Sequence, residues 1–464
     1  MNRRSKTVWL KAIAVTCAVF VGACGTVQRE EGNTMGKAKP KQTVSAKRAG
    51  AAKDWRQDDF TWIRGLDYTP SYAPNDVMTW RDFDAAVVER ELGYAEKMGI
   101  NSVRTWLQYI VFEHYPERFA ANFETFLSLC DKHGIRAMPI LFDSCFGQEP
   151  TIDWNGHWVM SPGTSKEVPE YWPKLQKYVD EVVGKHVGDR RVVIWDIMNE
   201  PAATPLTINF VKHWCEVIRK MDPTHPVTVG VAGGTTMVMP YVDDEDVLSM
   251  HSYSSPAVVL KYQINMMKRL GKEKGKPVII TECCAPAWGQ PYEMALPVLR
   301  ETGIGWYAWE LIIGKNQFNA VSGLLYPDGT CRRATAVAAV MNTTPDRVPF
   351  KEKPDSEGIP VKLPPPTKVP VNAELMEQIR AVAATPTTAD NLEYRKNHIL
   401  PHLIALGQLV TLSPQELQEA VGPILRSRDP EWNKDIARAC KDVDRVLAIF
   451  AGHLDEIDLD QLEE

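Results

Sequence analysis

Short apolar runs alternate with longer amphipathic stretches from about residue 55 to residue 343, and this alternation limits the folds open to the chain. Each apolar run has the length of a buried strand, and each amphipathic stretch has the period of a helix packed on one face. The predicted strands are Thr61–Leu66, Ser102–Trp106, Ala137–Phe142, Val192–Ile197, Val227–Val231, Val247–Met250, Pro277–Glu282 and Gly303–Trp309. The predicted helices between them include Phe83–Met98, Phe119–His133, Trp172–His186 and Thr207–Met221.

Eight strands at these spacings predict an α/β protein built on a closed (β/α)8 barrel, the TIM-barrel architecture. A doubly wound open sheet is the alternative fold. Such a sheet would normally carry a glycine-rich phosphate-binding loop after its first strand, and Arg64-Gly65-Leu66-Asp67-Tyr68 is not one. We therefore assign residues 55–343 to a barrel domain.

The chain after the barrel divides into a linker and a helical appendage. Residues 344–371 are proline-rich, culminating in Pro364-Pro365-Pro366, and are predicted to form a stiff connector. Residues 372–464 are predicted to be helical, because Ser413-Pro414-Gln415-Glu416 is a capping box followed by apolar residues on one helix face. The appendage either packs on the barrel or forms a small unit for a protein partner, and the sequence leaves both open.

The first 24 residues have the features of a lipoprotein signal peptide. A basic start precedes the apolar stretch Ala12–Gly22, which is too short for a comfortable membrane span. The segment Val21-Gly22-Ala23-Cys24 resembles a bacterial lipobox, in which the cysteine is lipidated; an ordinary secretory signal is the alternative. Residues 25–54 are polar and lysine-rich, as in a flexible tether. We therefore expect an extracytoplasmic protein, lipid-anchored through Cys24 to the outer membrane or the cell surface.

Charge and composition limit the partners and cofactors that we expect for this protein. The net charge of −6 gives no reason to expect nucleic acid as a partner. The sequence contains no Cys-x-x-Cys and no close Cys/His cluster, so we expect no zinc site and no other metal or cofactor. Fourteen tryptophans are many for 464 residues. Some would fill the core, but clefts that bind sugars also use flat aromatic faces.

Two glutamates stand at the ends of predicted strands. Glu200 lies in Asn199-Glu200-Pro201, directly after the run that begins at Val192, and Glu282 closes the run that begins at Pro277. These are the fourth and seventh strands, which face each other across a barrel. Retaining glycosidases place two carboxyl groups about 5 to 5.5 Å apart, one as acid/base and one as nucleophile. The alternatives are a helix-capping glutamate at position 200 and a loop carboxylate at position 282.

The two carboxyl groups would need different environments. An acid keeps its proton in an apolar or anionic neighbourhood, whereas a nucleophile stays ionised beside a cation or hydrogen-bond donors. Arg104, in the second strand, could supply the positive charge, unless it is a surface arginine. His251 and Tyr253 follow the sixth strand and, being two residues apart, can both face the mouth. The histidine could bind the acid or the sugar, and the tyrosine could steady the nucleophile.

Aromatic and acidic residues near other strand ends are candidates for sugar binding. Trp309, at the end of the eighth strand, could form a stacking floor under the sugar. Asp143, at the end of the third strand, could bind sugar hydroxyls or cap a helix. Further candidates for the walls of the site are Trp106, Trp154, Trp158 and Trp288.

In their order along the strands, these residues resemble glycoside hydrolase clan A, and most of all its family 5 cellulase/β-mannanase group. The resemblance covers residues 55–343 and rests on Arg104, Asn199-Glu200-Pro201, His251-x-Tyr253, Glu282 and Trp309. It implies a retaining β-glycosidase acting by double displacement on β-linked glycans of the β-glucan or β-mannan type. Glu200 would be the acid/base and Glu282 the nucleophile. Asn199 would bind the sugar 2-hydroxyl, Arg104 and Tyr253 would hold the nucleophile, and His251 would line the site near the acid/base.

The chain also departs from the family pattern. Family 5 members often carry a histidine at the end of the third strand, where this chain has Phe142-Asp143-Ser144. They commonly carry a glycine near the nucleophile, where this chain has Cys283-Cys284. The resemblance does not extend to the helices after residue 371. The expected partner is an oligo- or polysaccharide substrate, and the alternative function is that of a catalytically silent carbohydrate-binding lipoprotein on the same barrel.

Overall fold

A computed structural model of the chain describes residues 58–145, 147–365, 368–427 and 432–462. The predicted signal peptide (1–24), its lipobox cysteine Cys24 and the predicted tether (25–54) lie outside the described residues. None of the helices in the described part of the chain combines the length and the apolarity that a membrane-spanning helix needs.

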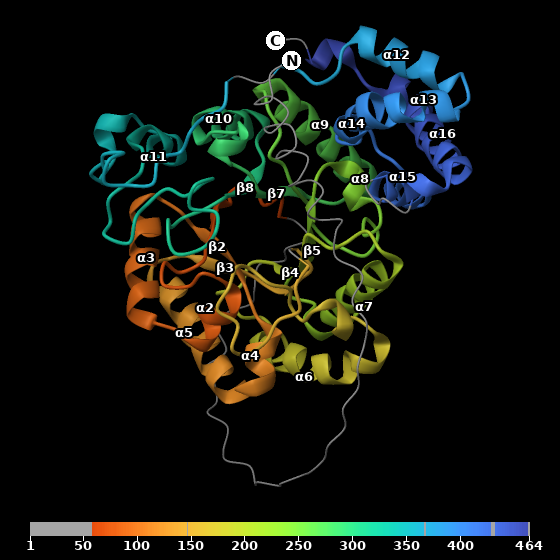
Figure 1. Cartoon of the computed structure of the whole chain (residues 1–464). Coiled ribbons are helices and arrows are strands. Elements are labelled where there is room, and N and C mark those ends of the chain that lie inside the picture. Colours follow the sequence, from red (N-terminus) through yellow and green to blue (C-terminus); the bar gives the residue numbers. More distant parts are fainter. Residues whose placement is uncertain (1–57, 146, 366–367, 428–431, 463–464) are drawn as a thin grey trace.

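In the described part of the chain, eight parallel strands close into a barrel in sequence order, with the last strand paired to the first (Figure 1). The strands are β1 (Arg64–Asp67), β2 (Ser102–Trp106), β3 (Arg136–Asp143), β4 (Trp195–Asn199), β5 (Val227–Ala232), β6 (Leu248–His251), β7 (Val278–Glu282) and β8 (Gly305–Ala308). The predicted (β/α)8 barrel is therefore confirmed. Strand β4 starts later than predicted because Val192 makes only an isolated bridge to Ala137.

Helices follow the strands and surround the barrel (Figure 1). Local sequence sets their ends: Asp84 caps the start of one helix through its side chain, and Gly275 and Gly303 end two others in the left-handed conformation that glycine adopts readily. The helices of the barrel domain are α2 (Asp76–Arg81), α3 (Ala85–Lys97), α4 (Tyr109–His114), α5 (Pro116–Lys132), α6 (Trp172–Val182), α7 (Pro205–Met221), α8 (Thr235–Val238), α9 (Ala257–Lys274), α10 (Tyr292–Thr302) and α11 (Ala334–Met341).

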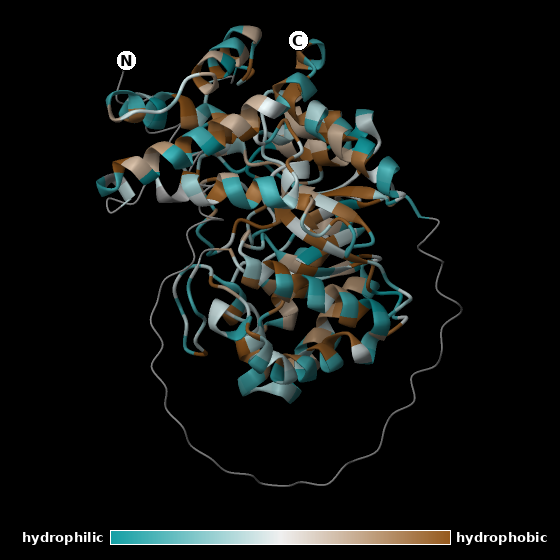
Figure 2. Cartoon of the chain, turned by 90° about the vertical axis from the view of Figure 1, so that its right-hand side faces the viewer, coloured by the Kyte–Doolittle hydropathy of each residue, from teal (hydrophilic) through white to brown (hydrophobic). Residues whose placement is uncertain are grey.

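The interior of the barrel is apolar at the amino-terminal ends of the strands and polar toward their carboxyl ends. The longer helices carry both hydrophobic and hydrophilic residues along their length (Figure 2), and their apolar faces pack against the strands. Inside the barrel, the amino-terminal end is closed by a buried apolar cluster: Phe60, Ile63, Met138, Val193, Ile194, Val247, Ile279 and Tyr307. The buried charged side chains discussed below therefore gather toward the carboxyl ends of the strands.

The carboxyl-terminal part of the chain is a helical unit packed on the barrel domain beside α8 and α9 (Figure 1). Its helices are α12 (Ala373–Ala383), α13 (Ala389–Tyr394), α14 (Leu400–Leu406), α15 (Pro414–Arg426) and α16 (Ile436–His453). They share one apolar cluster with Val259, Tyr262 and Met266 of α9. This packing favours the first of the two alternatives left open by the sequence, and binding of a protein partner by these helices stays a prediction.

Candidate active site

A pocket of about 570 Å³, open to solvent, lies at the carboxyl ends of the barrel strands. This is the end at which (β/α)8 enzymes place their catalytic groups. Its lining is mostly aromatic, with two carboxylates: Trp106, Cys145, Trp158, Asn199, Glu200, Tyr253, Glu282, Trp288, Trp309 and Phe318.

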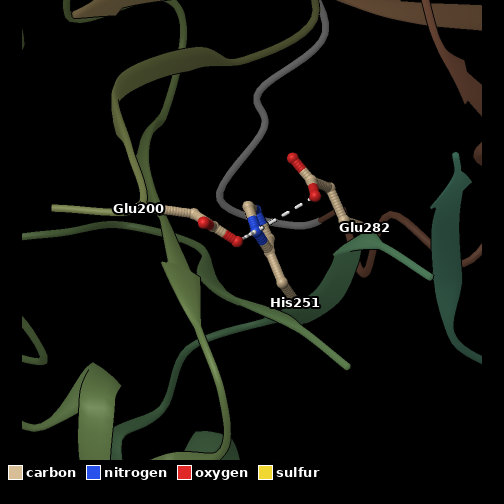
Figure 3. A group of neighbouring side chains, drawn as sticks. All are labelled: Glu200, His251 and Glu282. Carbon is tan, nitrogen blue, oxygen red and sulfur yellow. Dashed lines mark hydrogen bonds and ion pairs between the residues drawn. The ribbon is translucent and has the colours of Figure 1, made fainter. Parts of the chain in front are cut away.

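The side chains of Glu200 and Glu282 converge in this pocket. Oxygen atoms of the two carboxylates and a ring nitrogen of His251 all lie within 4.8 Å of one another. In Figure 3 the imidazole of His251 lies between the two carboxylates, within bonding distance of each. Such a short separation fits the carboxyl pair of a retaining glycosidase, and an inverting pair would be about 6.5 to 9.5 Å apart.

The backbone fixes where each carboxylate points. Glu282 is the last residue of β7, in register with His251 of β6. Glu200 directly follows β4 and has a φ of 42°, a left-handed conformation that few residues other than glycine adopt. Its amide N–H donates to the carbonyl of Gly230 at 2.6 Å, and its carbonyl accepts from Ser144 Oγ at 3.1 Å. This anchored turn directs the side chain into the pocket.

Glu282 is held by donors on both of its oxygens. Arg104 Nη1 donates to Oε1 at 2.7 Å, and the hydroxyl of Tyr253 donates to Oε2 at 2.6 Å. Arg104 is fully buried, so the interpretation as a surface arginine is wrong. A guanidinium and a hydroxyl on one carboxylate stabilise its ionised form, as a nucleophile requires.

Arg104 also connects Glu282 to three other polar residues of the barrel. Its Nε donates to Asp196 Oδ2 at 2.9 Å, its Nη1 to Asp67 Oδ1 at 3.1 Å and its Nη2 to Asn199 Oδ1 at 2.7 Å. Burial raises the pKa of Asp67 well above its usual value, although the neighbouring guanidinium acts in the opposite direction. The site is thus a buried charge network in which one guanidinium serves three carboxyl groups.

Glu200 is bonded to a histidine and a cysteine, whereas Glu282 is bonded to an arginine and a tyrosine. Its Oε1 lies 2.7 Å from Nδ1 of His251, and its Oε2 accepts from the thiol of Cys145 at 3.1 Å. Burial raises the pKa of Glu200. Burial also lowers the pKa of His251 to about 4, so the ring is neutral near pH 7 and adds no positive charge beside Glu200. A carboxyl group whose pKa is raised in this way suits a general acid.

Asn199 and Asp143 lie one behind the other at the wall of the pocket. Asn199 lines the pocket, and its amide donates to Asp143 Oδ1 at 3.4 Å. Asp143 itself is almost fully buried and is not among the lining residues. It accepts from the indole N–H of Trp158 at 3.2 Å and from the backbone N–H of Cys145 at 2.7 Å. In this structure, Asp143 therefore orders the loop that carries Cys145 and Trp158.

The predicted aromatic residues line the pocket with one exception. Trp106 and Trp309 pack edge to face with ring centroids 5.2 Å apart, and Trp158 packs against both. Trp288 contacts the ring of Tyr253 across the pocket, with centroids 5.3 Å apart. Trp154 is not part of the lining; its indole donates to the carbonyl of His157. Four indole rings are thus available to pack against a sugar.

Five residues of the site were not predicted from the sequence: Asp67, Cys145, Asp196, Gly230 and Phe318. Asp196 carries a weak signal, a single carboxylate inside the apolar run that forms β4. Gly230 is required sterically, because a Cβ there would lie 2.6 Å from Arg104 Nη2 and 3.0 Å from His251 Nε2. A glycine inside a strand indicates such a close approach, but it does not say which side chain approaches.

The same three side chains that converge in the pocket have the donor atoms of a metal site. Glu200, His251 and Glu282 each offer one ligand atom, and the three atoms lie within 4.8 Å of one another. Two features work against a bound cation: Arg104 places a positive charge 2.7 Å from Glu282, and His251 Nδ1 is engaged with Glu200. The donor set fits a pair of catalytic carboxyl groups better than a metal centre.

The fold and the site define a glycoside hydrolase barrel of clan A. Residues 91–314, which run from α3 past β8, match the family model "Cellulase (glycosyl hydrolase family 5)". Over this stretch, which is just under half of the chain, the barrel resembles the family 5-like enzymes of this clan.

Characterised relatives share only part of their length with this chain. The β-glucuronidase of Rattus norvegicus is 26% identical over 219 residues, which cover 45% of this chain and 29% of that protein. The β-glucuronidase of Homo sapiens is 24% identical over 184 residues, which cover 38% of this chain and 23% of that protein. The aligned part therefore spans less than a third of these relatives.

Solved structures with a similar fold include two mannan-degrading enzymes. An exo-β-1,4-mannosidase from Opitutaceae bacterium strain TAV5 superposes with a TM-score of 0.47 at 19% identity, covering 60% of this chain and 58% of that one. The endo-β-1,4-mannanase from Thermotoga petrophila superposes with a TM-score of 0.47 at 14% identity, covering 62% of this chain and 77% of that one.

Proposed function

We propose that this protein hydrolyses β-linked glycosides with retention of configuration, by double displacement. The observation that carries the proposal is the convergence of Glu200 and Glu282 within 4.8 Å in contrasting environments. Glu282 has a guanidinium and a hydroxyl on its oxygens, whereas burial raises the pKa of Glu200. Two carboxyl groups with separate roles are what this mechanism needs.

In the first step, the Glu282 carboxylate attacks the anomeric carbon and the glycosidic C–O bond breaks. Glu200 donates its proton to the departing oxygen, so that the leaving group departs as a neutral alcohol. The product is a glycosyl ester on Glu282. In the second step, ionised Glu200 takes a proton from water, the water oxygen attacks the anomeric carbon, and the Glu282 carboxylate is released. Two inversions give net retention.

The substrate we propose is a β-glucan or β-mannan type of glycan, made of neutral sugars. The family model and the four indole rings of the pocket support a polysaccharide substrate. The residues that line the pocket in the described part of the chain include no lysine and no arginine. Arg104, which lies beneath it, is already bonded to Asp67, Asp196 and Glu282. Among the described lining residues, none therefore offers a cation to the carboxylate of a uronate, the type of sugar that the name β-glucuronidase implies for those relatives.

The stereochemistry of azide rescue tests the two glutamates separately. With an activated aryl β-glycoside, Glu200→Ala should form the glycosyl enzyme, and azide should then yield the β-glycosyl azide. Glu282→Ala lacks the nucleophile, so azide should attack the substrate directly and yield the α-glycosyl azide. Glu273→Ala, on the exposed face of α9, is the matched control and should hydrolyse the substrate like the wild type.

The outcome of the azide experiment tests the roles assigned to the two glutamates. Full turnover by Glu282→Ala, or the same azide anomer from both variants, would overturn the assignment of roles. A folded wild-type protein that binds glycans but turns over no aryl β-glycoside would identify the silent carbohydrate-binding alternative instead.

We also propose that the protein is extracytoplasmic and lipid-anchored through Cys24. The support is the order of basic start, apolar stretch and Val21-Gly22-Ala23-Cys24 in the sequence. Cys24→Ser should move the protein from the membrane fraction to the soluble fraction, whereas Cys17→Ser, in the same apolar stretch, should leave it with the membrane. A Cys24→Ser protein that stays with the membrane would contradict the anchor.

A further inference from the structure

The helical unit contacts the loop after β6 through Gln408, which follows α14. Its Oε1 accepts from Ser254 Oγ at 3.0 Å and from Gln263 Nε2 at 3.4 Å. Its backbone carbonyl accepts from the same Gln263 amide at 3.2 Å. Gln408 also lies tightly against the loop after β5, since a Cβ on Gly234 would lie 3.1 Å from the carbonyl oxygen of Gln408. These contacts join two segments about 150 residues apart in the chain.

The barrel residues that Gln408 contacts flank Tyr253. Ser254 is the next residue along the chain, and Gln263 of α9 accepts from Ser252 Oγ at 2.6 Å. On the opposite side of the loop, Gln290 donates to the carbonyls of Ser252 and Ser254 at 2.9 and 2.8 Å. Ser252, Gln263 and Gln290 are buried, so these bonds are shielded from competing water. The loop is therefore fixed on both sides of Tyr253.

We propose that Gln408 is a positioning residue: it holds the Ser252–Ser254 loop so that the Tyr253 hydroxyl reaches Glu282. This inference rests on the proposed function, in which Glu282 is the nucleophile. The hydroxyl lies 2.6 Å from Glu282 Oε2, and a bond this short requires the ring to stay in one place. The helical unit would thereby contribute to the active site, although none of its described residues lines the pocket.

The geometry explains why a glutamine is suited to this position. Ser254 and Gln263 both present donors, and the amide oxygen of Gln408 accepts from both without bringing a charge to the loop after β6. Methionine has a similar length and shape but offers only a weak acceptor. Gln408→Met therefore removes the hydrogen bonds of the side chain while it keeps the volume and leaves the backbone carbonyl in place.

A double-mutant cycle on the full-length chain tests the inference. We expect Gln408→Met to lower kcat/KM for an activated aryl β-glycoside by roughly fivefold or more in the wild-type background. In the Tyr253→Phe background, where no hydroxyl remains to be positioned, the same substitution should change kcat/KM by less than about twofold. Ser254→Ala removes the barrel partner of the same hydrogen bond and should give the same pattern. It replaces Gln408→Met in the cycle if that variant folds poorly.

The controls separate positioning from general stability and from the proposed function. Gln415→Ala, on the exposed face of α15, should leave kcat/KM unchanged. The melting temperature of each variant is measured alongside. An equal fall in both backgrounds, or no fall in either, would overturn the role of Gln408. Absence of turnover by the wild type would instead count against the proposed function.

Discussion

The thiol of Cys145 lies 3.1 Å from Oε2 of Glu200 and donates its S–H to that carboxylate. Burial, followed by the charge of Glu200, raises the pKa of the thiol well above its usual value, so it stays protonated and remains a donor at all working pH values. On Glu200 the effects oppose each other: burial raises its pKa, while the Cys145 bond and the more distant Arg104 lower it. Cys145 therefore moderates the acidity of the proposed acid/base.

Cys145→Ala should shift the alkaline limb of the pH profile upward. In the wild type, the S–H bond stabilises the ionised form of Glu200. Removal of this bond therefore raises the pKa of Glu200, which stays protonated to higher pH. We expect the limb of kcat/KM to move up by roughly 0.5 to 1 pH unit. Cys440→Ala, at a half-buried position on α16, is the control and should not move it. A limb that stays in place or moves down would show that Cys145 does not act on Glu200.

Arg104→Met should destabilise the fold far more than removal of an exposed arginine. It would leave Asp67, Asp196 and Glu282 buried without their shared cation. Losing one partner of a buried ion pair costs about 3 to 5 kcal/mol, so the urea midpoint should fall markedly. Arg190→Met removes a pair whose arginine is 71% exposed, and its effect should stay within about 1 kcal/mol. Comparable losses in the two variants would contradict the central role of Arg104.

The barrel was predictable because its strands are buried on both faces. Such strands form continuous apolar runs, and the helices between them are amphipathic, so the two alternate visibly in the sequence. The boundaries were less certain: Val192 belongs to the apolar run before β4 but joins only one bridge, because the pairing of the chain decides where a strand begins. Apolar composition alone does not show at which residue of the run the strand begins.

The candidate site was predictable where polar residues end a strand, as Glu282 does, or follow one, as Glu200 and Tyr253 do. Asp196 was missed because it lies within a strand, where an apolar run suggests only core residues. Cys145 was missed because a thiol has no distinctive pattern, and its contact with Glu200 joins residues 55 positions apart. Gln408 could not be found from the sequence, since its role depends on how the helical unit docks against the loop after β6.

Glu310→Gln should stabilise the protein at alkaline pH. Burial raises the pKa of Glu310 to about 8, and Oε1 has no hydrogen-bond partner among the described residues. In the unfolded chain this carboxyl ionises near pH 4.5, so its favourable contribution is complete below that pH and is lost as pH rises toward 8. A glutamine cannot ionise and still accepts from Asn316. Above pH 8 the variant should be more stable by a few kcal/mol in urea unfolding.

The exposed Glu357→Gln provides the control for this effect and should not change how stability depends on pH. The difference between Glu310→Gln and the wild type should be small at pH 5 and grow toward pH 8. A difference that is constant over this range would show that Glu310 ionises normally in the folded protein.

Chelators should leave turnover unchanged, whereas added zinc should inhibit it. Of the candidate ligands Glu200, His251 and Glu282, the two glutamates supply the carboxyl groups that the proposed mechanism uses to donate a proton and to attack the sugar. A zinc ion seated there would displace the His251 contact on Glu200 and occupy the nucleophile, against the repulsion of Arg104. Inhibition should therefore require a large excess of zinc, and substrate should relieve it. Loss of turnover in a chelator, restored by a divalent cation, would contradict a mechanism that relies on the carboxyl pair alone.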